Sequence, residues 1–213
     1  MKLTHCIPAW PRIAAISMLA FITAVLVWAN VPATGASPEI SQARIIELED
    51  NEKTLNLAVE FGFDPMIVKV ARQTATREYV KRACACKTWR FIGSADALAY
   101  AVMSIIQMES RGNYRAVNLA GPAYGLTQFV MSTARQYDKN VSQDELLTIP
   151  RNLELAMEHF VDLLEQADGN HLLAFAAWNQ GSSVIRRSAA LGGDVGNSYA
   201  HAVLARAAMR NAE

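Results

Sequence analysis

The sequence has little of what a nucleic-acid-binding protein needs. Its 213 residues carry 20 basic and 20 acidic side chains, so the formal net charge is zero, and no long run of either sign occurs. Proteins that bind nucleic acids usually show a clustered basic face, so we expect no nucleic-acid partner. A hydrophobic content of 52% is enough for a real core, and the length suits one globular domain with an additional segment.

Cysteine is also scarce. The three cysteines are Cys6, Cys84 and Cys86. A zinc site needs about four ligands, usually in a spacing wider than the Cys-x-Cys of KRACACK, and a disulfide between residues two apart is strained. We therefore interpret Cys84 and Cys86 as small residues of a helix. A disulfide within the pair, or to another chain, is the alternative.

Residues 1–36 have the composition of a targeting segment. Residues 1–12 contain one lysine and one arginine and no acidic residue. An almost wholly apolar run follows at 13–30, and the small residues of VPATGA come next. This order is typical of an export signal cleaved after Ala36, and the run is also just long enough to span a bilayer. We predict a signal peptide or an inner-membrane anchor. In either case, residues 37–213 are exported to the periplasm or cell envelope.

Helical spacing of apolar residues dominates the rest of the chain. No run of alternating valine, isoleucine, threonine and aromatic residues bounded by turns indicates a strand. The predicted helices cover 38–60, 65–85, 94 or 96 to 110, 125–137, 150–167, 171–180 and 197–211. We therefore predict an all-α protein, with a helical N-terminal segment of unassigned role over 37–92 and a compact domain over 93–213.

The helix ending near residue 110 carries a carboxylate on its apolar face. Glu109 lies four residues after Ile105 and seven after Val102, so it continues their face. Apolar surroundings and the negative end of a helix both raise the pKa of a carboxyl group. A carboxyl that keeps its proton near neutral pH is a general acid, which glycoside-cleaving enzymes use. The alternative is a glutamate that turns to solvent or pairs with Arg111 or Arg115.

Three short motifs follow one another with the gaps of a known family. They are MES at 108–110, GLTQ at 125–128 and AWNQG at 177–181, and a tyrosine, Tyr199, opens the last predicted helix. Together they resemble the soluble lytic transglycosylase family, whose catalytic domain is lysozyme-like and related to goose-type lysozyme. The resemblance covers roughly residues 95–205, and the IPRNLELAMEHFVDLL helix resembles the family's connecting helix. Residues 37–92 lie outside it.

The resemblance implies a site with one catalytic residue. Glu109 would be the sole acid and base, and no metal or cofactor is implied. The substrate-binding positions that it implies are Ser110, Gly125, Gln128, Trp178, Asn179 and Tyr199, which would bind the glycan or orient its acetamido group.

Three residues depart from the family pattern. Trp178 stands where the family usually has a tyrosine whose hydroxyl hydrogen-bonds the catalytic glutamate, and an indole can donate but not accept. Either Tyr199 supplies that hydroxyl, or the acid is tuned differently. Thr127 replaces a methionine, and Met131 stands where proline is common, which alters the turn after the second motif.

The family's chemistry needs only one carboxylate. Ordinary glycosidases use two, and here Asp138, Asp144 and Asp194 fall in polar loops and are interpreted as solvated. In the family, the glutamate protonates the bond between N-acetylmuramic acid (MurNAc) and N-acetylglucosamine (GlcNAc). The acetamido group assists, and the glutamate then takes a proton from the 6-hydroxyl, which closes a 1,6-anhydro ring.

Two other functions stay open. One is a lysozyme-type hydrolase that admits water to the same acid, and the other is a non-catalytic glycan-binding or assembly module. Exported enzymes of this family often serve secretion, conjugation or phage machines that cross the envelope, and residues 37–92 could dock such a partner.

Overall fold

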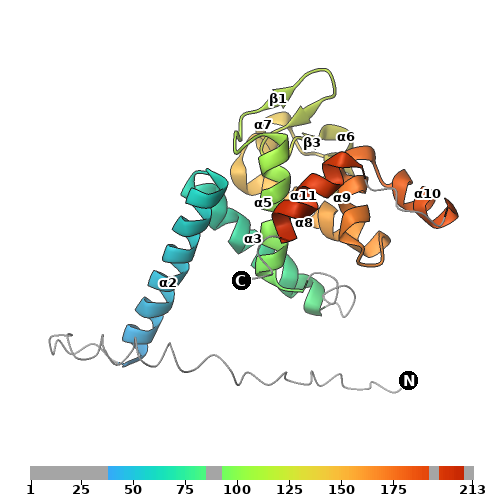
Figure 1. Ribbon diagram of the computed structural model, residues 1–213. Helices are drawn as coiled ribbons and strands as arrows, with labels where there is room; N and C mark the ends of the chain where they lie inside the picture. Colours follow the sequence, from blue (N-terminus) through green and yellow to red (C-terminus); the bar gives the residue numbers. More distant parts are fainter. Residues whose placement is uncertain (1–37, 85–92, 192–196, 209–213) are drawn as a thin grey trace, which may run out of the picture. The chain divides into compact units, whose positions relative to one another are not determined.

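Helices dominate the computed structural model, which describes residues 38–84, 93–191 and 197–208 (Figure 1). They are α2 (Pro38–Phe61), α3 (Pro65–Cys84), α5 (Ala95–Glu109), α6 (Met131–Tyr137), α7 (Gln143–Leu146), α8 (Ile149–Gln166), α9 (His171–Gln180), α10 (Ser183–Leu191) and α11 (Ser198–Ala208). The predicted helical, lysozyme-like class is confirmed. The α7 and α10 helices were not predicted.

Two compact units make up the chain, Met1–Leu48 and Glu49–Glu213. In the first unit, the described residues form the start of α2, and Ile46 and Leu48 on it are exposed. Among the described helices, none combines the length and apolar character needed to cross a membrane. The predicted apolar run at 13–30 lies outside the described residues, as do Cys6 and Cys86.

Several helix ends have the chemistry expected from the sequence. Asp64 accepts a hydrogen bond from the Met66 amide at 2.7 Å, just before α3. Ser94 is the N-cap of α5, because its side chain accepts from the Ala97 amide at 3.0 Å. Gly181 ends α9 with φ +84°, a left-handed value that glycine adopts without strain.

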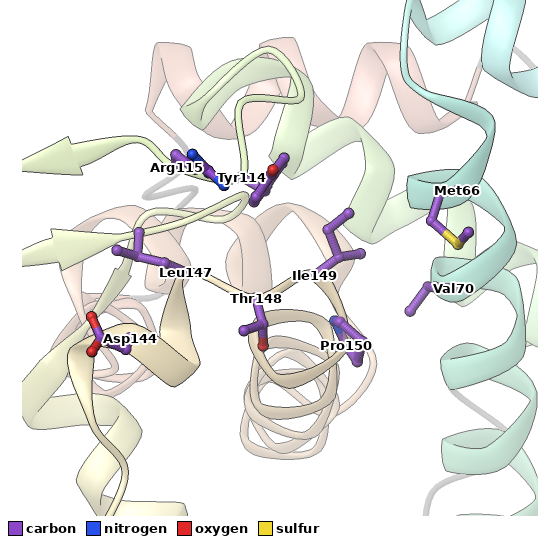
Figure 2. A pocket seen from close by; sticks show the side chains of 9 residues that line it. All are labelled: Met66, Val70, Tyr114, Arg115, Asp144, Leu147, Thr148, Ile149 and Pro150. Atoms are coloured by element: carbon purple, nitrogen blue, oxygen red, sulfur yellow. The ribbon is translucent and has the colours of Figure 1, made fainter.

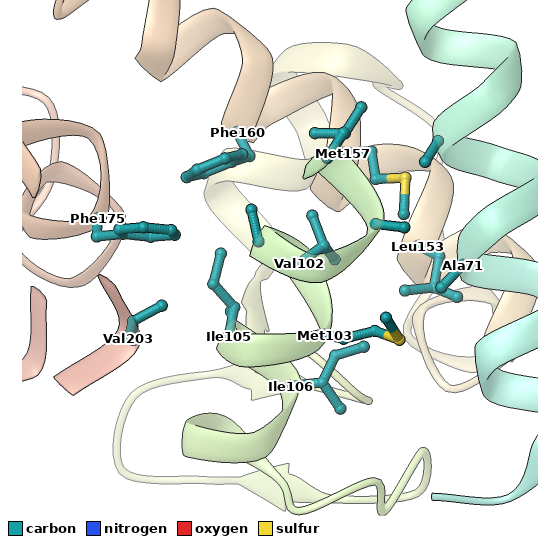
Figure 3. Packing of buried hydrophobic residues seen from close by; sticks show 14 of the residues in the cluster. Ala71, Val102, Met103, Ile105, Ile106, Leu153, Met157, Phe160, Phe175 and Val203 are labelled. Carbon is teal, nitrogen blue, oxygen red and sulfur yellow. The ribbon is translucent and has the colours of Figure 1, made fainter. Parts of the chain in front are cut away.

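The α5 helix lies at the centre of the core, rather than presenting a single apolar stripe. Its residues Leu98 to Ile106 are buried apart from the half-buried Tyr100. Figure 3 shows Val102 and Ile105 pointing toward Phe160 of α8 and Phe175 of α9. The two phenylalanine rings stack with centroids 5.0 Å apart. A helix that is apolar on all sides must be surrounded by others, so α5 holds its last residue in a fixed place.

The predicted N-terminal segment contributes to the same core. Buried side chains of α3, among them Ile67, Val68 and Ala71, pack in one cluster with α5 and α8. Polar links reinforce this, because Arg82 of α3 binds Asp162 of α8 at 2.7 Å. The boundary at 92/93 stays a prediction, but α3 shares the core of the residues that follow it.

A small antiparallel sheet corrects the prediction that the chain has no strand. Its strands β1 (Val117–Asn118), β2 (Ala123–Tyr124) and β3 (Phe129–Val130) are two residues long and pair in the order β1-β2-β3. Strands this short cannot show alternation in the sequence. They also replace the first half of the helix predicted over 125–137, so that α6 begins only at Met131. The Met131 amide donates to the Pro122 carbonyl at 3.2 Å, a hydrogen bond that proline could not make.

Of the three aspartates predicted to be solvated, Asp138 is instead paired. It caps the end of α6 and forms an ion pair with Arg151 of α8. Asp144 is exposed in the first turn of α7. Asp194 lies outside the described residues.

Candidate active site

Glu109 is the last residue of α5, and its side chain is half-buried. The Tyr199 hydroxyl, from the start of α11, donates to its Oε1 atom at 2.6 Å. Burial raises the pKa of Glu109 above its ordinary value, while the hydrogen bond from Tyr199 lowers it to a lesser extent. Burial also raises the pKa of Tyr199, so this phenol keeps its proton. The geometry favours a carboxyl that holds a proton more tightly than one in water.

Tyr199 therefore supplies the hydroxyl that Trp178 cannot. Trp178 is a half-buried residue near the end of α9, and hydrogen bonding from its side chain also lowers the pKa of Glu109. Its ring stacks on Phe129 with centroids 5.7 Å apart and lies 5.4 Å from His159. The indole is thus close enough to the carboxyl to affect its pKa, and its ring packs on Phe129 and His159. No ion pair joins Glu109 to Arg111 or Arg115, all of which lie in the described part of the chain.

The chain turns sharply after the carboxylate. Ser110 caps α5 through its amide, which donates to the Ile106 carbonyl at 3.0 Å. Arg111 and Gly112 then both have positive φ, +54° and +84°. Within the described residues, the Ser110 Oγ atom is buried without a hydrogen-bond partner. Such atoms are rare because an unpaired buried polar group is costly, and this one belongs to the residue that follows Glu109.

The second motif holds the loop beside the carboxylate. Gln128, with φ +48°, donates from its Nε2 atom to the Ala116 carbonyl at 3.2 Å and to the Gly125 carbonyl at 3.1 Å. Gly125 is buried with φ +75°, and a Cβ atom there would overlap the Leu146 carbonyl. Both residues therefore have a structural role in the loop, and their part in substrate binding stays a prediction.

Asn152 is the residue of this region that the sequence analysis missed. It is fully buried, and its Oδ1 atom accepts from the amide and the hydroxyl of Thr127, at 3.1 and 2.8 Å. Its Nδ2 atom donates to the carbonyls of Tyr124 and Leu146, both at 2.9 Å. One side chain of α8 thereby fixes the second motif. The available signal was an asparagine on the apolar face of the predicted helix, one turn before Ala156.

Asn179 lies one residue beyond Trp178 and is exposed. Its Oδ1 atom accepts a hydrogen bond from Asn197 at 2.8 Å, and Asn197 caps α11 by accepting from the Ala200 amide at 2.8 Å. This link joins the third motif to the helix that carries Tyr199. Glu109, Trp178 and Tyr199 thus come together directly, whereas Asn179 joins them through Asn197.

A cavity of about 640 Å³ is lined in part by the 110–116 loop (Figure 2). Its walls are mostly apolar and come from four parts of the chain. They are Met66 and Val70 of α3, Tyr114 and Arg115 of the loop, Asp144 of α7, and Leu147 to Pro150 at the start of α8. The Arg115 guanidinium lies 5.4 Å from the centre of the Tyr114 ring. Glu109 does not line this cavity.

Comparison with models of protein families identifies the family to which this domain belongs. The family model for the transglycosylase SLT domain matches residues 94–199, a span that begins at the cap of α5 and ends at Tyr199. The chain carries an SLT domain and belongs to that family. At the family level, an SLT domain implies activity of the lytic transglycosylase type on peptidoglycan. Comparison with curated proteins and with solved structures gave no match.

Proposed function

We propose that the protein is a peptidoglycan lytic transglycosylase that uses Glu109 as general acid and then as general base. It would cleave the β-1,4 bond between MurNAc and GlcNAc and leave a 1,6-anhydro-MurNAc end. The observation that carries the proposal is the half-buried Glu109 carboxyl, whose pKa is raised and whose Oε1 atom accepts from Tyr199 at 2.6 Å. Such a group holds a proton to donate and has a fixed partner when it becomes an anion.

The steps balance without water. The protonated Glu109 gives its proton to the glycosidic oxygen, and the bond from that oxygen to the MurNAc anomeric carbon breaks. The 2-acetamido oxygen of MurNAc attacks the anomeric carbon and holds the positive charge. The 6-hydroxyl of MurNAc then attacks that carbon and displaces the acetamido oxygen, while the Glu109 carboxylate takes the hydroxyl proton. Glu109 ends in its starting state.

The other residues have supporting parts in this proposal. Tyr199 and Trp178 donate toward the carboxyl and stabilise its anion between the two steps. Ser110, with its buried Oγ atom beside the acid, would bind the glycan. Asn179 would contact the sugar from the exposed end of α9, and Gln128 and Gly125 would shape the loop that borders it.

The proposed cellular location rests on the sequence of the N-terminal segment. We place the catalytic domain outside the cytoplasm because residues 1–36 have the composition of an export signal or anchor. Residues 37–92 would then include a docking segment for an envelope-spanning machine.

Digestion of purified peptidoglycan by the full chain tests the proposal, with products identified by mass spectrometry. We expect anhydro-MurNAc products, lighter by one water than hydrolysis products, and none from Glu109→Gln. Reducing-end products would instead indicate a lysozyme-type hydrolase. Undigested wall that retains bound protein, equally for wild type and Glu109→Gln, would indicate a glycan-binding module.

A further inference from the structure

A row of hydrogen-bonded side chains that the proposed mechanism does not use ends at the Trp178 ring. The Tyr137 hydroxyl of α6 lies 2.9 Å from Oδ2 of Asp162 and 2.9 Å from Nδ1 of His159, both on α8. The His159 ring is tilted against Trp178, with centroids 5.4 Å apart and planes at 51°, and it meets Phe129 edge-on at 5.5 Å. The His159 ring therefore lies between a hydrogen-bonded group and the indole.

The donors and acceptors fix where the protons lie. A carboxylate can only accept, so the single hydroxyl hydrogen of Tyr137 goes to Asp162. The His159 Nδ1 atom must then donate to the Tyr137 oxygen. Burial lowers the pKa of His159 to about 4, so at neutral pH the ring is uncharged and carries its one proton on Nδ1. The position of this proton sets the orientation of the ring.

Ion pairs hold the other end of this row of side chains, at Asp162. Arg82 of α3 binds Asp162 at 2.7 Å and Glu78 at 2.7 Å, and its side chain is 15% exposed. Glu158 adds a further negative charge near Tyr137, and burial together with Asp162 raises the pKa of that phenol. Tyr137 therefore remains a neutral donor at neutral pH.

We propose that His159 is a positioning residue for the catalytic acid: its ring, oriented by Tyr137 and Asp162, holds Trp178 against Phe129 so that the indole stays at the Glu109 carboxyl. His159 touches no reacting atom in this role. The catalytic part of the inference rests on the proposed function, whereas the control of the indole by His159 does not.

Two substitutions of His159 test the effect of its ring and the effect of its hydrogen bond separately. His159→Asn keeps a donor near the Nδ1 position but removes the ring, and His159→Phe keeps a ring but removes the donor. Tyr137→Phe removes the hydroxyl that orients His159. The matched control is His171→Asn on α9, because His171 is also half-buried with a lowered pKa but binds the Gly169 carbonyl at 3.1 Å.

The first measurement needs no activity. In the full chain with Trp10, Trp28 and Trp89 replaced by phenylalanine, all indole emission comes from Trp178. We expect acrylamide quenching of that emission to rise about twofold or more in His159→Asn, and less in His159→Phe and Tyr137→Phe. His171→Asn should leave it unchanged.

The second measurement is the pH–rate profile on peptidoglycan. Loss of the indole donor raises the pKa of Glu109, so the alkaline limb should move upward by about half a unit, with kcat reduced several-fold and KM little changed. The inference is overturned if all three variants match His171→Asn in quenching and in the alkaline limb. Should His159→Asn fail to fold, His159→Phe and Tyr137→Phe decide. If wild type forms no anhydro products, the proposed function fails, while quenching still decides the role of His159.

Discussion

Replacing Tyr199 by phenylalanine removes one oxygen from the site and leaves the ring in place. The lost contact is the 2.6 Å hydrogen bond to Glu109 Oε1. A hydrogen bond to a charged group contributes about 1.5–3 kcal/mol, and one between neutral groups about 0.5–1.5 kcal/mol. The hydroxyl thus favours the Glu109 anion over its neutral form by about 1 kcal/mol. Since one pKa unit corresponds to about 1.4 kcal/mol, the pKa of Glu109 should rise by nearly one unit.

The sign of the change is fixed by the role of Glu109. A general acid loses activity as it deprotonates, so a higher pKa moves the alkaline limb of the pH–rate profile upward. The first step turns the acid into its anion, and a loss of about 1 kcal/mol of stabilisation of the developing anion slows that step about fivefold. We would measure rates on purified peptidoglycan from about pH 4 to about pH 9, so that the profile covers the titration of the catalytic acid. Tyr100→Phe is the control, because Tyr100 is a half-buried phenol of α5 without a contact to Glu109. An alkaline limb in Tyr199→Phe that stays in place or moves downward would refute this reasoning.

Three predictions concern stability. Gly125→Ala should lower the free energy of unfolding by about 3 kcal/mol, and Tm by roughly 6–12 °C in calorimetry, because of its positive φ and crowded Cβ position; Gly121→Ala, with open space around it, should be neutral. Asn152→Ala should cost about 3 kcal/mol or more in urea unfolding, because it leaves buried groups unpaired, whereas an exposed asparagine, Asn140→Ala, should cost under about 0.5 kcal/mol. The pKa of His159 is lower in the folded protein than in the unfolded chain, so the unfolded chain binds more protons as the pH falls. The free energy of unfolding of the wild type should therefore decrease by up to about 3 kcal/mol from pH 6.5 to about 4. In His159→Asn, that dependence on pH should be shallower, and an unchanged slope would contradict the assignment.

The motifs and the longer helices could be predicted because their signals are local. The α9 helix occupies the predicted residues 171–180, and α8 differs from its prediction by one residue at each end. The position of Glu109 at the end of an apolar helix followed from spacing alone. The alternative that Tyr199 supplies the missing hydroxyl was open from the sequence, and the contact at 2.6 Å selects it.

The supporting side chains could not be predicted because their partners are distant in sequence. Asn152 and His159 both lie on the apolar face of α8, where a polar residue is a signal of burial but not of its partners. Asn152 binds Thr127, and His159 meets Trp178, only after the helices pack. The sheet was missed for another reason, since its two-residue strands are held by pairing rather than by a pattern in the sequence.

Titration of the Glu109 carboxyl carbon by NMR tests the central claim most directly. With glutamate labelled at Cδ, the resonance of Glu109 is the one that disappears in Glu109→Gln. The account predicts a midpoint above the ordinary 4.5, with a further rise in Tyr199→Phe. A midpoint at or below 4.5 would contradict it, because Glu109 would then have no proton to give at the pH where the wall is cut.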